Sequence, residues 1–495
     1  MSFRKAAGCI LAIVEFILSI LFIWFAISTK VIPMKYLLLA GIALGILPIL
    51  IVLMQIKKTS GIVGIVLSAL VCAGLGYGIY LVRHADKTLE KVTGTTTEIT
   101  VVNVYVKADD PAQSINEAVN NGYVFGVLKE GEREKVNEAI SEIEKDLSAA
   151  LQIKEYESIF DIAGAVDSNE IKAFIVNSGF VASLDGSEEY PNYSNNLRIL
   201  LEKQIETEVP EVTPVEKKDL PKKEAGCFVA YVSGIDTYGA VSVKARSDVN
   251  ILAIVNRNTR QILLLSTPRD YWVPLPVSGS SRDKLTHAGI YGIDVSMGTL
   301  EMLYDVSIDY FIRVNFSGFE DIINALGGVD VESQYAFSTK MGVNSYSYEK
   351  GMNHLSGDAA LAFARERYSF SDGDFQRGRN QMAVIKAVIS ALESSRILNN
   401  FTRLMDSLAE SFETNMSKEQ LGELVQEQLE TNKSWTTLQY SAKGTAAMRP
   451  CYSSGGGDRS VVLQDDASIE YANELIRKVL AGEVMTQADI TDNAP

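Results

Sequence analysis

Two aspartates stand where strands are expected to end and to begin. Asp236 follows the apolar run 228–235, and Asp248 precedes the apolar run 249–255. Adjacent strands can bring both carboxylates to one edge of a sheet. This arrangement suits Mg²⁺, with Mn²⁺ as the alternative, because such ions take one or two carboxylates together with waters and substrate phosphates. On spacing alone, a pair of solvated or capping aspartates is the preferred interpretation.

Arginines follow in three further windows. Arg269 stands in the segment TPRD, where a proline ends the strand-like run 261–267 and the chain leaves the sheet. Arg365 and Arg367 lie in a helical stretch, and Arg377 follows in the segment DGDFQRGRNQ. The planar, permanently charged fork of arginine matches phosphate oxygens, so the arginines of the windows 365–367 and 372–381 could together hold a diphosphate. A salt-bridged surface explains them equally well.

Several classes of function are excluded. The chain has no P-loop, HExxH, GxSxG or CxxC motif, and its 495 residues include only three histidines. The segment up to Arg83 carries a net charge of +6, and the remainder therefore carries −22 of the total of −16. That charge repels phosphate backbones, so we expect no nucleic-acid partner.

Three apolar stretches near the N-terminus predict a membrane segment over residues 1–83. They cover residues 6–27, 36–54 and 61–82, and each is about the 20 residues that a helix needs to cross a bilayer. Three spans place the two ends of the chain on opposite sides of the membrane. Glu15 lies inside the first stretch, where a helix-packing contact or a position near the headgroups is the favoured interpretation.

The remaining chain divides into four parts. Residues 94–204 predict a small α/β accessory domain, and residues 205–224, with three prolines among charges, predict a linker. Residues 225–395 alternate strands with helices, which predicts an α/β sandwich with a central mixed sheet. Residues 396–495 are expected to form packing helices and a tail.

Four cysteines occur in the chain. Cys9 and Cys72 lie in apolar helices and are expected to pack there. Cys227 and Cys451 lie in the soluble part. If that part is outside the cell, these two could form a disulfide, and this is a hypothesis.

The order of these motifs resembles the LytR-CpsA-Psr family. The likeness covers about residues 227–392, in the segments SGIDTYG, ARSDVNILAIVN, STPRDYWVP, DKLTHAGIYG, IDYFIRVNFSGFEDIINALGGVDVE and LAFARERYSFSDGDFQRGRNQ. The three apolar stretches and the accessory domain are similar to the CpsA or Wzg branch, which occurs in capsule and exopolysaccharide clusters of Gram-positive bacteria.

The resemblance implies a multi-pass protein of the cell membrane with its C-terminal domains outside the cell. The implied enzyme takes a capsular, exopolysaccharide or related glycan from its polyprenyl-diphosphate carrier. It attaches the glycan to peptidoglycan through a phosphodiester, by metal-assisted phosphotransfer. The implied partners are the lipid-linked glycan, peptidoglycan, membrane lipid and polysaccharide assembly proteins. The implied fold is an α/β/α sandwich with an apolar tunnel for the polyprenyl tail.

The resemblance also implies residue roles. Asp236 and Asp248 are the expected magnesium ligands. The residues expected to bind the lipid phosphates are Arg269, Arg365, Arg367, Arg377 and Gln381. These four arginines and Asp374 form the expected catalytic set, in which Asp374 orients arginines or assists proton removal. Asn380 stands where many members carry arginine, which leaves the role of Arg379 open, and Arg246 is expected to be structural.

Two alternative functions remain. The first is a regulatory membrane protein of capsule or exopolysaccharide assembly, which acts through its accessory domain. The second is a hydrolase or a passive binder of the polyprenyl diphosphate, which would use the same arginines.

Overall fold

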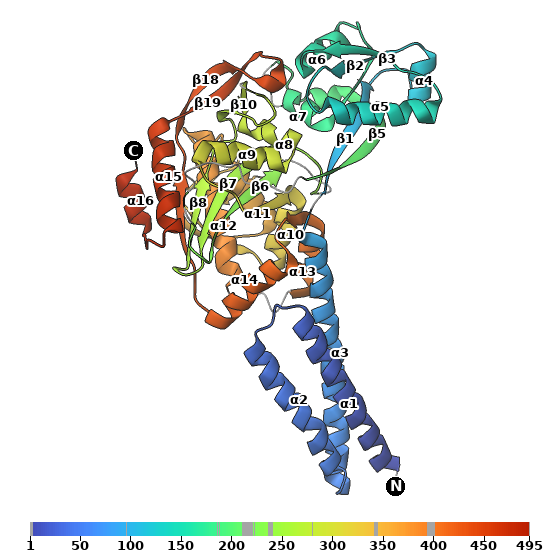
Figure 1. The fold of residues 1–495 in the computed structure, drawn as a ribbon, viewed down its shortest axis with the longest axis vertical. Coiled ribbons are helices and arrows are strands. Elements are labelled where there is room, and N and C mark those ends of the chain that lie inside the picture. The colour runs from blue at the N-terminus through green and yellow to red at the C-terminus, as the bar shows by residue number, and fades with distance from the viewer. Residues whose placement is uncertain are drawn as a thin grey trace. The chain divides into compact units, whose positions relative to one another are not determined.

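The computed structural model describes residues 3–95, 97–185, 187, 189–209, 221, 223–235, 241–279, 281–340, 345–393 and 401–494 (Figure 1). The chain forms two compact units. Unit 1 comprises Met1–Gly94, Ala391–Ala409 and Met416–Ser434. Unit 2 comprises Thr95–Ser390, Glu410–Asn415 and Trp435–Pro495.

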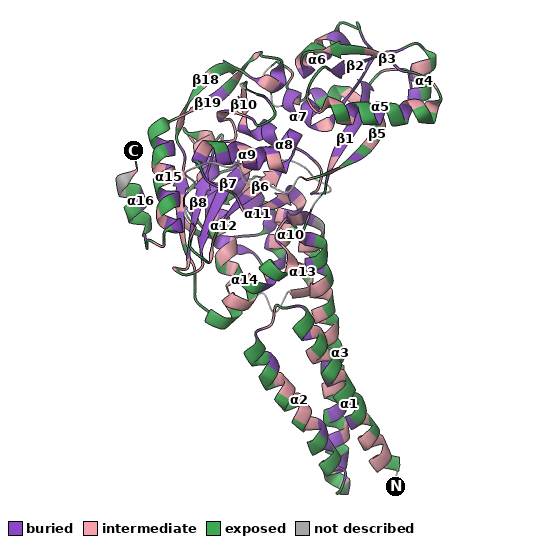
Figure 2. Ribbon diagram, in the orientation of Figure 1, coloured by how far each residue is buried: buried purple, intermediate pink, exposed green. Residues whose placement is uncertain are grey.

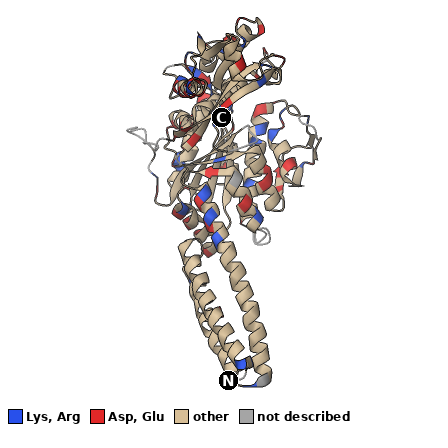
Figure 3. Ribbon diagram, turned by 90° about the vertical axis from the view of Figure 1, so that its right-hand side faces the viewer, with Lys and Arg blue, Asp and Glu red and all other residues tan. Residues whose placement is uncertain are grey.

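Unit 1 contains the predicted membrane helices α1 (Phe3–Ser28), α2 (Met34–Met54) and α3 (Lys58–Val92). All three are long and apolar enough to cross a membrane, and Figure 3 shows them almost without charged residues between their ends. The three-helix prediction is confirmed, although α3 continues past the apolar stretch. Glu15 is fully buried and accepts a hydrogen bond from the Ser68 hydroxyl on α3. The favoured helix-packing interpretation of Glu15 is therefore confirmed.

The extension of α3 packs within unit 1 against α13 (Phe401–Ser411) and α14 (Lys418–Thr431). His84 Nε2 lies 2.9 Å from the Asp406 carboxylate, and Lys418 forms an ion pair with Asp86. Part of the C-terminal hundred residues thus belongs with the N-terminal helices.

Unit 2 begins with the accessory domain, whose five-stranded sheet has the order β3-β2-β4-β1-β5. The strands are β1 (Thr97–Lys107), β2 (Val124–Leu128), β3 (Gln152–Tyr156), β4 (Ala173–Asn177) and β5 (Leu197–Glu208). The helices are α4 (Ile115–Asn120), α5 (Arg133–Leu147), α6 (Ile159–Asp167) and α7 (Ser178–Asp185). The predicted α/β domain is confirmed, and its last strand extends into the range expected for the linker.

The main sheet of unit 2 has six strands in the order β16-β11-β6-β7-β8-β17. They are β6 (Cys227–Ile235), β7 (Ser247–Asn256), β8 (Gln261–Ser266), β11 (Tyr310–Asn315), β16 (Phe412–Thr414) and β17 (Thr436–Ser441). The pairs β6–β11 and β8–β17 are parallel, whereas β6–β7, β7–β8 and β11–β16 are antiparallel. The predicted mixed sheet is confirmed.

Helices cover both faces of this sheet, whose inner strands are mostly buried (Figure 2). Alternate side chains of each strand point to opposite faces. On β7, Leu252 and Ile254 therefore pack with α8, α9 and α15, whereas Ile251 and Ala253 pack against Met382 of α12. The helices are α8 (Leu285–Tyr291), α9 (Ile293–Tyr304), α10 (Phe316–Ala325), α11 (Gly357–Arg365), α12 (Gly373–Leu392), α15 (Asp466–Leu480) and α16 (Gln487–Asn493).

The C-terminal segment differs from the expectation of packing helices and a tail. Its strands β16 and β17 form the two edges of the main sheet, so a boundary at residue 395 would divide that sheet.

Strands β18 (Gly444–Pro450) and β19 (Asp458–Gln464) form a hairpin beside a second one, β9 (Trp272–Pro274) with β10 (Arg282–Lys284). The remaining short strands are β12 (Val329–Ser333), β13 (Phe337–Ser338), β14 (Ser347–Tyr348) and β15 (Gly351–Leu355).

The accessory domain and the main domain share buried contacts within unit 2. Phe180 and Leu184 of α7 belong to the same apolar core as Leu285 and Ile290 of α8. Arg313 of β11, only 3% exposed, is ion-paired with Glu98 of β1 and with Glu413 of β16. The accessory domain is therefore packed against the main domain as part of one unit.

The expected disulfide is absent, because Cys227 and Cys451 are both free thiols. Cys227 begins β6, where it is paired with Asn256 of β7. Cys451 is buried in the turn after β18, close to Asp283. The two cysteines lie in separate elements, each already packed by other residues.

Candidate functional site

Asp248 and Arg269 meet where β7 begins and β8 ends, at the edge of the main sheet that runs across the strand ends. Strands β7 and β8 are antiparallel, with Ile251 opposite Ser266, so the start of β7 and the residues after β8 lie at the same edge. There Arg269 donates a hydrogen bond to Asp248 Oδ2 at 2.6 Å. The sequence predicted that the carboxylates of Asp236 and Asp248 meet at this edge, and of these two the structure describes only Asp248. Asp236 lies outside the described residues.

Helix α8 closes the site from one side. The Thr286 hydroxyl donates to Asp248 Oδ1 at 3.2 Å, and the Thr286 amide donates to the Arg269 carbonyl at 2.8 Å. Gly289, one turn later, allows this approach, because a Cβ there would lie 2.3 Å from the Ala245 carbonyl oxygen. Thr286 is a site residue that the sequence analysis did not single out, although it lies within the quoted segment DKLTHAGIYG.

Helix α12 brings the last arginine motif to the same edge. Gly378 packs against the end of β8, where an added Cβ would lie 2.6 Å from Ser266 Oγ. This close approach places the neighbouring Arg377 beside Arg269, and the two positive charges act on each other strongly enough to affect the pKa of Arg377. Gln381, one turn further along α12, is buried.

Asp374 joins two of the predicted arginines. Its Oδ1 lies 3.0 Å from Arg377 and 3.7 Å from Arg367. The Arg377 side chain is 10% exposed, whereas those of Arg367 and Asp374 are 32% and 30% exposed. Arg377 is thus the more buried of the two arginines, and Arg367 is the one that solvent and a substrate can reach.

The sequence suggested that Arg365 and Arg367 lie on one helix, and the structure contradicts this. Helix α11 ends at Arg365, and Glu366 already has extended backbone angles. Buried Glu366 accepts the amides of Lys340 and Ser369, which fixes this break in the chain. The Arg365 guanidinium lies 4.3 Å above the ring of Phe316, at the start of α10. No described contact joins Arg365 directly to the group around Arg269.

Asp270 and Lys284 extend the charged group. Lys284 Nζ lies 3.1 Å from Asp270, which also lies 3.7 Å from Arg269 Nε. The described contacts join Arg269, Lys284, Arg367 and Arg377 to Asp248, Asp270 and Asp374, and the charge of Arg246 also acts on Asp248. These side chains form one charged group of both signs.

Burial and the neighbouring charges shift the pKa values of Asp248 and Arg377. Burial opposes ionisation of Asp248, but the charges of Arg269, Arg246 and Arg377 outweigh it and hold its pKa well below the ordinary value. Burial and the nearby Arg269 together lower the pKa of Arg377, in spite of Asp374. Asp248 is therefore ionised at neutral pH, and Arg377 lies in a buried position beside a second cation.

The charged group offers few carboxylate ligands for the expected metal. The described residues contain no group of three or more His, Cys, Asp or Glu that could hold an ion. Asp248 offers one ionised carboxylate whose oxygens have further lone pairs beyond those used by Arg269 and Thr286. Because Mg²⁺ needs only one or two carboxylates when substrate phosphates and waters complete its shell, these residues fit it.

Arg379 points to different partners from its neighbours in the motif. It donates to Gln376 Oε1 at 2.8 Å through Nε and forms an ion pair with Asp372. These contacts hold the start of α12 together. These contacts are consistent with a structural role for Arg379.

A family model described as the LytR_cpsA_psr family matches residues 199–460, which is more than half of the chain. The chain belongs to the LytR-CpsA-Psr family. The resemblance identified from the motifs is therefore confirmed. The match includes every charged residue of the site and also β16 and β17, which agrees with their place in the main sheet of the family domain.

Named members of the LytR-CpsA-Psr family are similar to part of this chain. The polyisoprenyl-teichoic acid–peptidoglycan teichoic acid transferase TagU of Bacillus cereus is 35% identical over 189 residues, which is 38% of this chain and 60% of that protein. The corresponding transferase TagT of Bacillus subtilis is 35% identical over 201 residues, with the same shares. The chain thus spans about 60% of the length of these relatives. The crystal structure of B. subtilis TagV aligns with a TM-score of 0.42 and 28% identity, over 55% of this chain and all of that one.

Proposed function

We propose that this protein is a phosphotransferase that moves a glycopolymer from a polyprenyl-diphosphate carrier to peptidoglycan. The observation that carries the proposal is the meeting of Arg269, Arg367 and Arg377 with ionised Asp248 at one sheet edge. Support also comes from the relatives, whose names describe transfer of polyisoprenyl-linked teichoic acid to peptidoglycan. The three apolar helices would anchor such an enzyme in the membrane that contains its lipid substrate.

The arginines bind the diphosphate and stabilise the charge that grows on it during the reaction. Arg377 and Arg269 are largely buried, so their interaction with a phosphate is weakly screened by water. An acceptor hydroxyl attacks the phosphorus nearer the sugar, and the lipid leaves as its monophosphate. Asp374, held between Arg377 and Arg367, keeps both guanidinium groups oriented and can accept the hydroxyl proton.

The proposal includes Mg²⁺, held by Asp248 with Asp236 as the expected second ligand. The ion would supply further positive charge on the phosphate oxygens. Asp248 suits this role because the surrounding arginines keep it ionised. Removing divalent cations with a chelator should therefore stop turnover, and added Mg²⁺ or Mn²⁺ should restore it.

We further propose that the glycan belongs to the capsular or exopolysaccharide class and that the soluble domains lie outside the cell. The three membrane helices and the accessory domain, which resemble those of the CpsA or Wzg branch, support this assignment. An odd number of spans places the soluble part on the side opposite the N-terminus.

The test is a turnover assay on the full chain in detergent, with lipid-linked glycan and with or without peptidoglycan fragments. A transferase gives a covalent sugar–muropeptide product only when the fragments are present. A hydrolase releases free polymer without them, and a passive binder or a regulator gives neither product. Replacement Arg365→Ala should abolish the release of lipid phosphate, and wild-type turnover in that variant would remove Arg365 from the site.

A further inference from the structure

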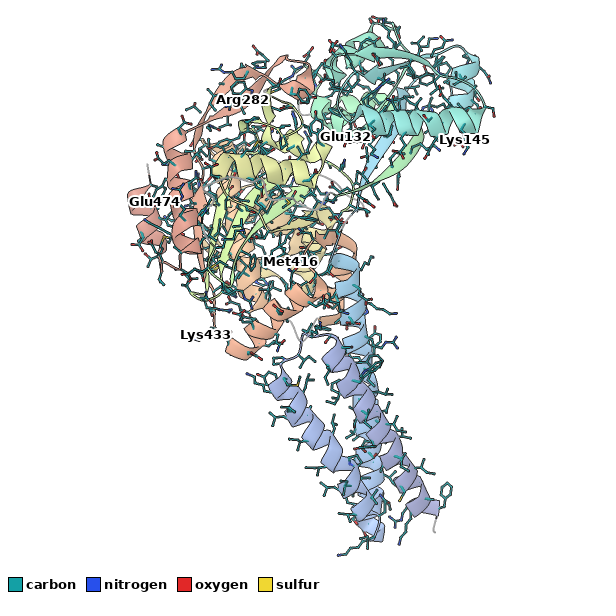
Figure 4. The ribbon with its side chains drawn as sticks, in the orientation of Figure 1. Glu132, Lys145, Arg282, Met416, Lys433 and Glu474 are labelled. Carbon is teal, nitrogen blue, oxygen red and sulfur yellow. The ribbon has the colours of Figure 1, made fainter. Side chains whose placement is uncertain are left out.

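A second pocket lies within unit 2, where the accessory domain meets the two hairpins beside the main sheet. It encloses about 530 Å³, which is within the range of about 300–1,000 Å³ for small-molecule sites. One wall comes from Glu130 and Phe180 of the accessory domain, and the other from β9, β10 and the turn after β18. Figure 4 labels Arg282, which lies in β10 on this second wall. The charged group around Asp248, Arg269 and Arg377 is called the phosphate site below, and none of its residues lines this pocket.

Aromatic rings form the sides of the pocket. Trp272, Tyr291 and Tyr452 line it, with the centroids of the two tyrosine rings 6.2 Å apart. Trp272 Nε1 donates to the Pro450 carbonyl at 2.9 Å, and the edge of Phe180 packs against Tyr291 at 5.9 Å. These contacts hold the rings in place before any ligand arrives. Flat aromatic faces suit a ligand with apolar C–H faces.

The charged groups of the pocket are of both signs. Glu130 accepts the Tyr452 hydroxyl at 2.9 Å, and Glu157 lies 3.0 Å from Lys129. Arg282 lies 5.0 Å from the Trp272 ring and donates to the Trp272 carbonyl. The lining carries Glu130, Glu157 and Arg282, and Lys129 and Arg449 lie beside it, so neither sign of charge dominates. These side chains offer acceptors and donors for hydroxyl groups.

The pocket is rigid and not reactive. The turn 451–457 is closed by its own backbone hydrogen bonds, including Gly456 to Cys451 at 3.0 Å. Gly455 has a φ of +60°, and a Cβ there would lie 2.9 Å from Ser158 of the accessory domain. Burial and the neighbouring Asp283 raise the pKa of the Cys451 thiol to about 12, so it is not a nucleophile at neutral pH. The arrangement suits binding of a ligand and not covalent chemistry.

The pocket is close to the phosphate site along the chain. Trp272 follows Arg269 by three residues, so their Cα atoms are at most about 11 Å apart. Lys284, paired with Trp272 between β10 and β9, also binds Asp270 of the phosphate site. Sugar residues attached to a phosphate at Arg269 are therefore within reach of these hairpins.

We infer that the pocket between the accessory domain and the β9–β10 and β18–β19 hairpins is a saccharide-binding subsite. This inference rests on the proposed function and adds to it a place for the sugar residues. An oligosaccharide combines apolar ring faces with many hydroxyl groups, which matches aromatic walls bordered by carboxylates and a guanidinium. Its source is either the transferred glycopolymer or the glycan strand of peptidoglycan.

The test uses the full chain in detergent and measures tryptophan fluorescence during titration with two probes. One probe is the peptide-free glycan fragment of peptidoglycan, and the other is the phosphate-free oligosaccharide of the cell's own glycopolymer. Tyr452→Ala should weaken binding by about tenfold or more, because one stacking face is lost. Trp272→Ala should do the same when binding is followed by calorimetry. Tyr452→Phe keeps the ring and should bind within about threefold of wild type.

Binding of either probe with this variant pattern supports the subsite, and the probe that binds identifies the source. No binding of either probe, or equal binding by wild type, Tyr452→Ala and Trp272→Ala, overturns it. Release of lipid phosphate is measured on the same preparations. Saccharide binding without release would contradict the phosphotransferase proposal alone, whereas release without saccharide binding would contradict the subsite alone.

Discussion

The Asp248 carboxylate and the Arg269 guanidinium are joined at 2.6 Å, with only 17% and 14% of their side chains exposed. A buried carboxylate is costly to ionise unless a cation is paired with it. Here Arg246 and Arg377 add to the effect of Arg269, so Asp248 remains charged in spite of burial. The Asp248 carboxylate can then bind Arg269 and, in the proposed mechanism, a divalent cation.

We expect a specific pH dependence of stability from this pair. The folded-state pKa of Asp248 is lowered, so its contribution is present above the unfolded pKa of about 3.9 and is lost as the pH falls toward the folded pKa. The slope is about 1.4 kcal/mol per pH unit in that window. Urea unfolding between pH 2.5 and 6 should show a shallower acid dependence in Asp248→Asn than in wild type. The exposed Asp109→Asn is the control, and identical slopes in all three proteins would contradict the assignment.

Two arginines of one helix should differ in their effect on turnover. Arg377→Ala removes a buried cation from the phosphate site and should lower lipid-phosphate release by about 10²–10³-fold, or about 2.7–4 kcal/mol. Arg379→Ala breaks only contacts with Gln376 and Asp372 and should keep turnover within about threefold. Initial rates with lipid-linked glycan give the comparison. Equal losses in both variants would contradict the separate roles assigned to Arg377 and Arg379.

The ion pairs of Arg313, one to Glu98 of the accessory domain and one to Glu413 of the main domain, should contribute strongly to stability. Arg313→Ala leaves Glu98 and Glu413 buried without their partner and should reduce the free energy of unfolding by about 3–5 kcal/mol. Arg133→Ala, which breaks an accessory-domain pair with the half-exposed Glu155, should cost about 1 kcal/mol or less. Denaturant unfolding of the full chain measures both. A small effect of Arg313→Ala would mean that the domains do not depend on this contact.

The cysteines give a direct chemical check. Four free thiols should be counted on the denatured, unreduced chain, because all four cysteines are unpaired. In the folded protein Cys451 should react slowly at neutral pH, since burial raises its pKa to about 12. A count of two would restore the Cys227–Cys451 disulfide that the sequence suggested.

The apolar patterns of the sequence predicted some strands of the main sheet and not others. The runs at 228–235, 249–255 and 261–267 correspond to β6, β7 and β8, because apolar strands buried on both faces are conspicuous in a sequence. Strands β16 and β17 were missed, since three-residue and polar edge strands carry little apolar signal. Their positions are set by long-range pairing with β11 and β8.

The sequence by itself determined the membrane helices, the mixed sheet and the identity of the charged motifs, because these depend on local composition and on motif order. Only the tertiary structure decided which charges meet: Arg377 reaches Arg269 because Gly378 packs on Ser266, and Thr286 reaches Asp248 because Gly289 packs on Ala245. The absence of the disulfide and the pocket beside Trp272 were likewise decided by packing between residues far apart in the chain. Such contacts depend on the shape of whole elements, which no local pattern of residues records.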